Sequence, residues 1–69
     1  MRRFAQSVEI SVAEVEALRL KHLKELEQTD AAEAMGISQS TFQRILSSAH
    51  KKVAFALIHG HTIHIGALE

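Results

Sequence analysis

Apolar residues recur at helical spacing over most of the chain and predict three helices. These are expected over about 11–25, 28–35 and 39–59. The third carries an apolar stripe whose members lie four or three residues apart: Phe42, Leu46, Ala49, Val53 and Ala56. One side of this helix is therefore expected to be buried. The pattern predicts a single all-α domain over 1–69, with a long third helix.

The ends of the helices carry recognisable signals. Ser11 and Glu14 have the spacing of a capping box, in which each side chain bonds the backbone N–H of the other. Gly60 is expected to end the third helix. The first helix is expected to bury Val15, Leu18 and Leu23. Its water-facing side is expected to carry Glu14, Glu16, Arg19, Lys21 and Lys24.

Two short segments at the ends of the chain favour extended structure. Val8 and Ile10 alternate with polar residues near the N-terminus, and a second strand is expected over about 62–65. A lone strand leaves its backbone groups without partners. The two segments are therefore expected to pair, either within one chain or between two chains, and the second arrangement would make a dimer.

The segment 28–45 joins two helical patterns through Gly36. Ala32 is expected where the two helices cross, because a larger side chain there would push them apart. Gly36 falls at a sharp turn that favours a positive φ. Ser38 is expected to cap the third helix by accepting a hydrogen bond from a backbone N–H of its first turn. Together these features predict a helix-turn-helix, although a similar corner also occurs in helical proteins that bind nothing.

The outward face at the start of the third helix is polar and lacks acidic residues. In a helix-turn-helix, this face lies in the major groove of DNA, where Gln reads adenine and Arg reads guanine. The expected groove contacts are Ser38, Gln39, Ser40, Gln43 and Arg44. The expected phosphate contacts are Thr41, Ser47, His50 and Lys51.

The net charge of the chain affects its expected affinity for DNA. The 69 residues carry eight basic and eight acidic side chains, so the formal net charge is zero. Because affinity for DNA depends on neutralising phosphates, a single copy is expected to bind weakly. The small core and modest charge favour a homodimer. Phe55 and Ile58 lie off the buried stripe and are expected to meet a second subunit or the tail of the same chain.

The chain lacks the residues of familiar catalytic sites. It has no cysteine, no glycine-rich phosphate loop and no carboxylate pair in a plausible pocket, so we expect no enzyme activity. His59, His61 and His64 fall within six residues and raise the question of a metal site. In a strand, however, His61 and His64 would point to opposite faces. We therefore expect neither a metal nor a cofactor.

A cytoplasmic location is expected. No apolar run approaches the roughly 20 residues that cross a membrane, and the charged N-terminus lacks the apolar core of a signal peptide. No membrane partner is expected for the same reason. Arg2 and Arg3 fit either a basic arm that enters a minor groove or a solvated terminus.

Four motifs carry a family resemblance: EALRL at Glu16–Leu20, AAEAMGIS at Ala31–Ser38, TFQRIL at Thr41–Leu46 and KKVAFAL at Lys51–Leu57. In this register the sequence closely resembles uncharacterised protein family 0251 (domain of unknown function 134), small prokaryotic proteins predicted to bind DNA. That family looks like sigma-factor region 4. The resemblance implies double-stranded DNA as partner and transcriptional control as function, with docking on RNA polymerase as the alternative. Glu27 and His50 depart from the family pattern of a small or polar cap and an arginine.

Overall fold

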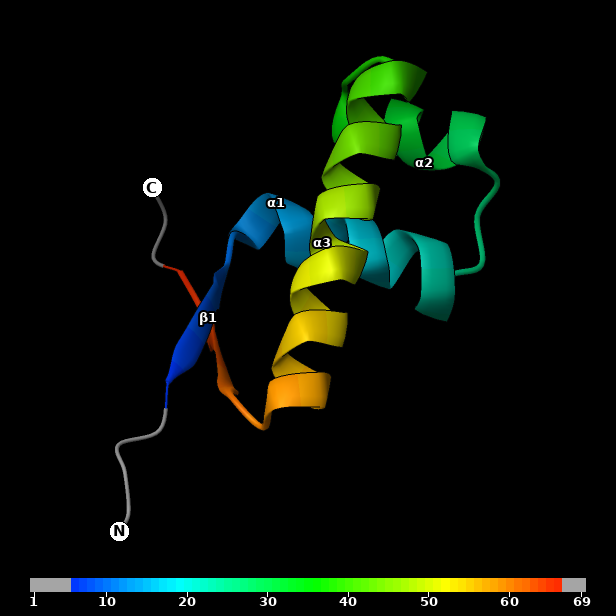
Figure 1. Cartoon of the computed structure of the whole chain (residues 1–69). Helices are drawn as coiled ribbons and strands as arrows, with labels where there is room; N and C mark the ends of the chain where they lie inside the picture. The colour runs from blue at the N-terminus through cyan, green and yellow to red at the C-terminus, as the bar shows by residue number, and fades with distance from the viewer. Residues whose placement is uncertain (1–5, 67–69) are drawn as a thin grey trace, which may run out of the picture.

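The computed structural model of the protein describes residues 6–66 and is mostly helical (Figure 1). The elements in chain order are β1 Ser7–Ile10, α1 Val12–Leu18, the π-helical turn η1 Arg19–Leu23, α2 Gln28–Met35, α3 Gln39–His59 and β2 Thr62–Ile65. The long helix α3 contacts the other two helices and both strands. The helix α1 crosses behind it, α2 packs on its first turns and the strands lie beside its last turns. The structure has α2 and α3 over the ranges that the apolar pattern predicts.

The first helix differs from the continuous helix predicted over 11–25. From Arg19 the helix widens into η1, in which the backbone N–H of Lys24 donates to the carbonyl of Arg19, five residues back, at 3.0 Å. The helical turn ends at Leu23, and Glu25 then adopts a left-handed φ of 56°. A π-helical turn is rare and usually forms a single bulge, so the sequence pattern of an α-helix does not predict it.

The wider turn changes which side chains are buried. Leu23, expected inside, is 79% exposed, whereas Ala17 and Leu20 are buried. A π-helical turn holds more residues than the 3.6 of an α-helical turn, so Leu23, at the end of η1, is rotated away from the face predicted for an α-helix. The prediction for Leu23 is therefore wrong, and the core lies on the Ala17 and Leu20 side.

The core lies where α1, η1, α2 and α3 meet. Phe42 is fully buried within it. Around this ring lie mainly small or branched aliphatic side chains: Ala17, Leu20, Ala31, Ala32 and Leu46. The alanines let the helices approach closely, as expected for Ala32 at the crossing of α2 and α3.

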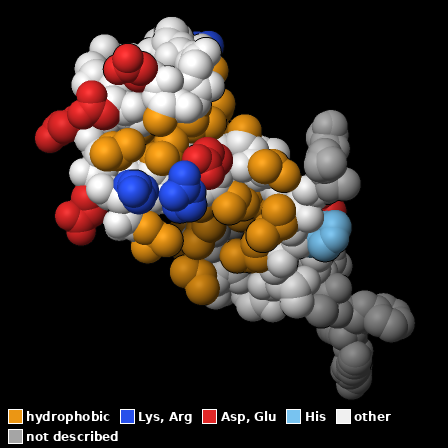
Figure 2. All heavy atoms as spheres, turned by 180° about the vertical axis from the view of Figure 1, so that it is seen from behind, with side chains coloured by type: hydrophobic (Ala, Val, Ile, Leu, Met, Phe, Trp, Pro, Cys, Tyr) orange, Lys and Arg blue, Asp and Glu red, His pale blue; other side chains and the backbone are white. Residues whose placement is uncertain are grey.

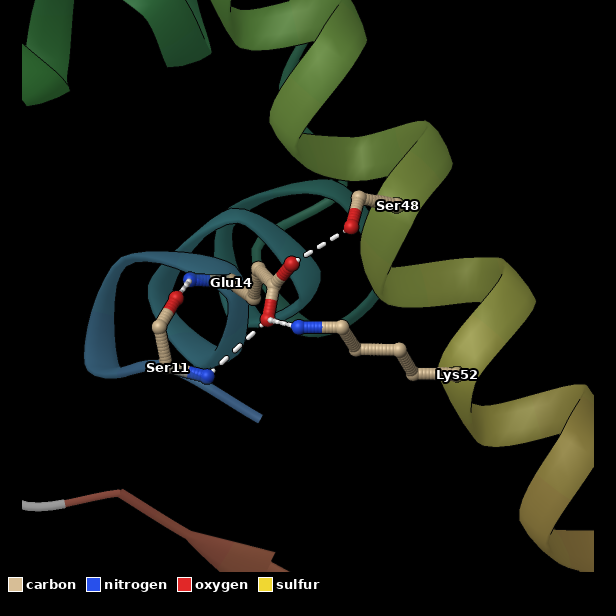
Figure 3. A network of polar contacts seen from close by, with 4 residues as sticks. All are labelled: Ser11, Glu14, Ser48 and Lys52. Atoms are coloured by element: carbon tan, nitrogen blue, oxygen red, sulfur yellow. Dashed lines mark hydrogen bonds and ion pairs between the residues drawn. The ribbon is translucent and has the colours of Figure 1, made fainter. Parts of the chain in front are cut away.

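Glu14 was expected in water and is instead buried between α1 and α3 (Figure 3). Its carboxylate accepts hydrogen bonds from the Ser11 N–H at 2.9 Å, Ser48 Oγ at 2.6 Å and Lys52 Nζ at 3.0 Å. Burial alone raises the pKa of Glu14, but the hydrogen bonds from Ser48, Ser11 and Lys52 outweigh it and lower that pKa to about 2. The ionised carboxylate therefore ties the start of α1 to α3.

The two strands pair within the chain as a parallel sheet, in which Ser7 lies opposite Thr62 and Ile10 opposite Ile65. This is the first of the two arrangements left open by the sequence. Ile10 is buried, whereas every residue of β2 is exposed. Within residues 6–66, no helix combines the length and apolar character needed to cross a membrane. Arg2 and Arg3 lie outside the described residues.

Candidate nucleic-acid interface

The corner between α2 and α3 depends on Gly36. Its φ of 70° and ψ of 31° are left-handed, and its N–H donates to the carbonyl of Glu33 at 3.0 Å. The next N–H, of Ile37, donates to the carbonyl of Ala32 at 3.0 Å. A Cβ built on Gly36 would meet no atom within 4 Å. The backbone conformation, rather than the space around it, therefore requires glycine here.

Ser38 caps α3, as the sequence predicts. Its Oγ accepts a hydrogen bond from the Thr41 N–H at 3.2 Å and donates to Thr41 Oγ1 at 2.9 Å. Across the corner, Gln28 Nε2 donates to the carbonyl of Gln39 at 3.5 Å. By contrast, Glu27 at the start of α2 makes no side-chain cap. Ser38 thus holds the first turn of α3 in place.

The nine side chains predicted to contact DNA lie mostly on the surface. Thr41 is half-buried, and the other eight are exposed: Ser38, Gln39, Ser40, Gln43, Arg44, Ser47, His50 and Lys51. In the same turns, Phe42 and Leu46 are buried. No acidic residue occurs anywhere in α3. The first turns of α3 therefore present a polar surface free of negative charge.

Ion pairs divide the basic side chains into two groups. Arg19 bonds Glu16 at 2.8 Å and Lys52 bonds Glu14 at 3.0 Å, so their charges are partly neutralised. The side-chain hydrogen bond from Arg19 lowers the pKa of Glu16. Within residues 6–66, Arg44 and Lys51 form no ion pair. The positive charge of α3 that is open to an anion therefore lies at these two residues.

His50 differs from the other predicted phosphate contacts. Its Nε2 lies 2.8 Å from Nε2 of His22, on η1, and both side chains are exposed. Sequence reasoning missed His22 because 28 residues separate it from His50 and no local pattern links them. Lys51, the next residue, has no partner of this kind within the described part of the chain.

An open apolar trough of about 670 Å³ lies between the first helix and the C-terminal half of α3. It is lined by Val15, Leu18, Arg19, His22, Leu23, His50, Val53, Ala54 and Leu57. On the face seen from behind, apolar side chains also gather across the middle of the molecule (Figure 2). Leu57 and Ile58 are 75% and 78% exposed. Exposed apolar side chains are therefore present at Ile58 and at its neighbour Leu57, which lines the trough.

Phe55 was expected to meet a second subunit or the chain's own tail. Its ring centroid lies 4.2 Å from that of His59 and 5.4 Å from that of His61, so the tail covers part of it. His64 contacts Glu9, at 2.6 Å between Nδ1 and Oε2. Among residues 6–66, no group of three or more His, Cys, Asp or Glu side chains is arranged to hold a metal ion.

Relatives of the chain share its sequence over most of its length. A UPF0251 protein of Desulforudis audaxviator is 58% identical over 60 residues, which are 87% of this chain and 39% of that relative. A UPF0251 protein of Ruminiclostridium cellulolyticum is 57% identical over 58 residues, 84% of this chain and 46% of that relative. The chain thus spans less than half the length of these curated relatives. No solved structure matches it. The family model described as "Protein of unknown function DUF134" matches residues 2–68, and the chain therefore belongs to this family.

Proposed function

We propose that this chain binds double-stranded DNA sequence-specifically and acts as a transcriptional regulator. In this proposal α2 and α3 form a helix-turn-helix similar to sigma-factor region 4, and α3 is the reading helix. The observation that carries the proposal is the exposed, polar and acid-free surface on the first turns of α3, held in place by Gly36 and Ser38.

The dimensions of α3 fit this role. An α-helix is about 10–12 Å wide, and the major groove is about 12 Å wide. Gln39, Gln43 and Arg44 are of the types that bond base edges in that groove. Lys51 follows Gln39 by twelve positions, about 18 Å along the helix axis. In this proposal α3 lies at an angle to the groove, and Lys51, this far from Gln39, contacts a phosphate rather than a base.

The neutral net charge favours two copies acting together. Because basic and acidic side chains are equal in number, phosphate neutralisation by one copy supplies little affinity. A homodimer doubles the contacts and reads two half-sites about 34 Å apart. The proposal therefore includes a palindromic target.

Selection from a random duplex DNA library, with binding titrated against salt, tests the proposal. We expect one motif to be enriched, and affinity for it to fall steeply as salt rises. Arg44→Ala should cost about 1–3 kcal/mol on the enriched site if this side chain reads a guanine. Arg19→Ala removes the same charge from a residue paired with Glu16 outside α3 and is the matched control. No enrichment together with salt-independent binding would refute the proposal.

The apolar trough favours a second function, a protein-interaction module that docks on RNA polymerase. Leu57, which lines the trough, is 75% exposed, and exposed apolar surface of this kind is typical of contact sites. Purified bacterial RNA polymerase is the probe. Leu57→Ser should weaken this binding and leave DNA selection unchanged, whereas Arg44→Ala should do the reverse. Polymerase binding that Leu57→Ser does not change would exclude the trough as the docking site.

A further inference from the structure

His22 and His50 form a close pair that no motif in the sequence explains. Their Nε2 atoms are 2.8 Å apart, and their ring centroids are 5.1 Å apart at an angle of 52°. One ring comes from η1 and the other from the middle of α3, so the pair bridges two elements. Both rings also line one wall of the apolar trough.

The segment that carries His22 departs from regular structure in three ways. It is π-helical, it leaves Leu23 79% exposed, and it is followed by Glu25 with a left-handed φ of 56°. The left-handed Glu25 is strained, and the exposed Leu23 gains nothing from burial. A hydrogen bond between two exposed rings contributes little to folding stability. π-Bulges and strained residues of this kind gather at functional sites.

We propose that His22 and His50 bind a divalent transition-metal ion, with zinc as the representative ion. Two imidazole nitrogens on a tetrahedral zinc, each about 2.0–2.1 Å from the metal, lie about 3.3 Å apart. The two Nε2 atoms are 2.8 Å apart, so they need to separate by only about 0.5 Å to bind the metal. Water completes the coordination, because both rings are exposed.

Binding requires a change of tautomer. In the observed contact one Nε2 carries the hydrogen and the other accepts it. On the metal both Nε2 atoms offer lone pairs, so the hydrogen of the donor ring moves to its own Nδ1 through water. On the metal each ring therefore carries its hydrogen on Nδ1. Nitrogen ligands of this type suit zinc, copper and nickel, whereas magnesium prefers oxygen.

The earlier expectation of no metal site rested on His59, His61 and His64. His22 and His50 are a different pair, and zinc binding by them does not depend on DNA binding. His59 gives a matched control, because it lies on α3 like His50, is exposed and is near neither His22 nor His50 in the described contacts.

Titration of the whole chain with zinc chloride near neutral pH, with magnesium chloride in parallel, tests the proposal. We expect one zinc per chain, a higher melting temperature with zinc and no effect of magnesium. His22→Gln and His50→Gln should each lower zinc affinity at least about tenfold, since even loss of an outer-shell partner costs about 10–100-fold. His59→Gln should bind zinc like the unchanged chain.

Nitrogen NMR of the histidine rings in the unchanged chain gives a second readout that does not depend on how the variants fold. Zinc should shift the Nε2 signals of His22 and His50 and leave the other rings unchanged. Zinc binding that is equal in the His22→Gln chain, or shifts confined to other histidines, would overturn the proposal. Absence of zinc binding at millimolar concentration would do the same.

Discussion

Replacing Glu14 by glutamine keeps the size of the side chain and removes its charge. In the folded chain this carboxylate accepts hydrogen bonds from Ser11, Ser48 and Lys52, and its pKa falls from 4.5 to about 2 (Figure 3). Each pKa unit corresponds to about 1.4 kcal/mol, so the shift is equivalent to about 3 kcal/mol of folding stability at neutral pH. Lys52 is 38% exposed, and water screens its share. We expect Glu14→Gln to lower the free energy of unfolding by about 2–3 kcal/mol.

The loss should depend on pH in one direction. The folded pKa lies below the unfolded value of 4.5, so the unfolded chain takes up a proton first as pH falls. The stabilisation is therefore fully present above that value and disappears as pH falls towards 2. Urea unfolding followed by circular dichroism, at neutral pH and at about pH 2, measures it for both chains. The difference between them should be large at neutral pH and close to zero in acid.

Glu16→Gln is the matched control for this measurement. Glu16 lies on the same helix, but its partner Arg19 and its own side chain are exposed, so the variant should unfold at nearly the same urea concentration. Equal destabilisation of the Glu14→Gln chain at both pH values would refute the reasoning, because it would show that packing rather than charge is lost. Unchanged stability at neutral pH would refute it as well.

Three further substitutions have expected outcomes. Phe42→Ala removes the fully buried ring and should cost about 3–5 kcal/mol, a large part of the stability of a small domain, measured by urea unfolding. In the Gly36→Ala chain the added Cβ would meet no atom within 4 Å, but alanine would have to adopt a φ of 70°. The substitution should lower the free energy of unfolding by about 1 kcal/mol and the melting temperature by about 4–8 °C. Lys51→Ala should weaken DNA binding alike on all sequences and reduce the salt slope by about 1, whereas an unchanged slope would exclude a phosphate contact.

The sequence predicted most of the helices because their signals are local. Ser11 and Glu14 form the expected capping box, Ser38 caps α3, and Gly36 and Gly60 end α2 and α3 in left-handed conformations. Each of these interactions joins residues within about four positions, so a short stretch of sequence contains both partners. The prediction of the first helix is wrong after Leu18, because nothing local in its residues distinguishes a π-helical turn from an α-helical one.

The candidate DNA surface was predicted in the same way, from periodicity. Gln39, Gln43 and Arg44 are exposed on the first turns of α3, where Phe42 is buried. Their role in reading DNA remains a prediction. His50 was assigned from its neighbours along the chain, and its contact with His22 could not be predicted because it depends on how η1 lies against α3.

The sequence by itself determined where α2 and α3 begin and end, where the chain turns between them and which side of α3 is apolar, since hydrogen bonds and caps within a few residues decide these features. Only the tertiary structure decided the rest: the parallel pairing of β1 with β2, the burial of Glu14 against Ser48 and Lys52, and the pair formed by His22 and His50. These contacts join residues 28 to 55 positions apart. Their partners are chosen by the packing of whole elements, which no local pattern encodes.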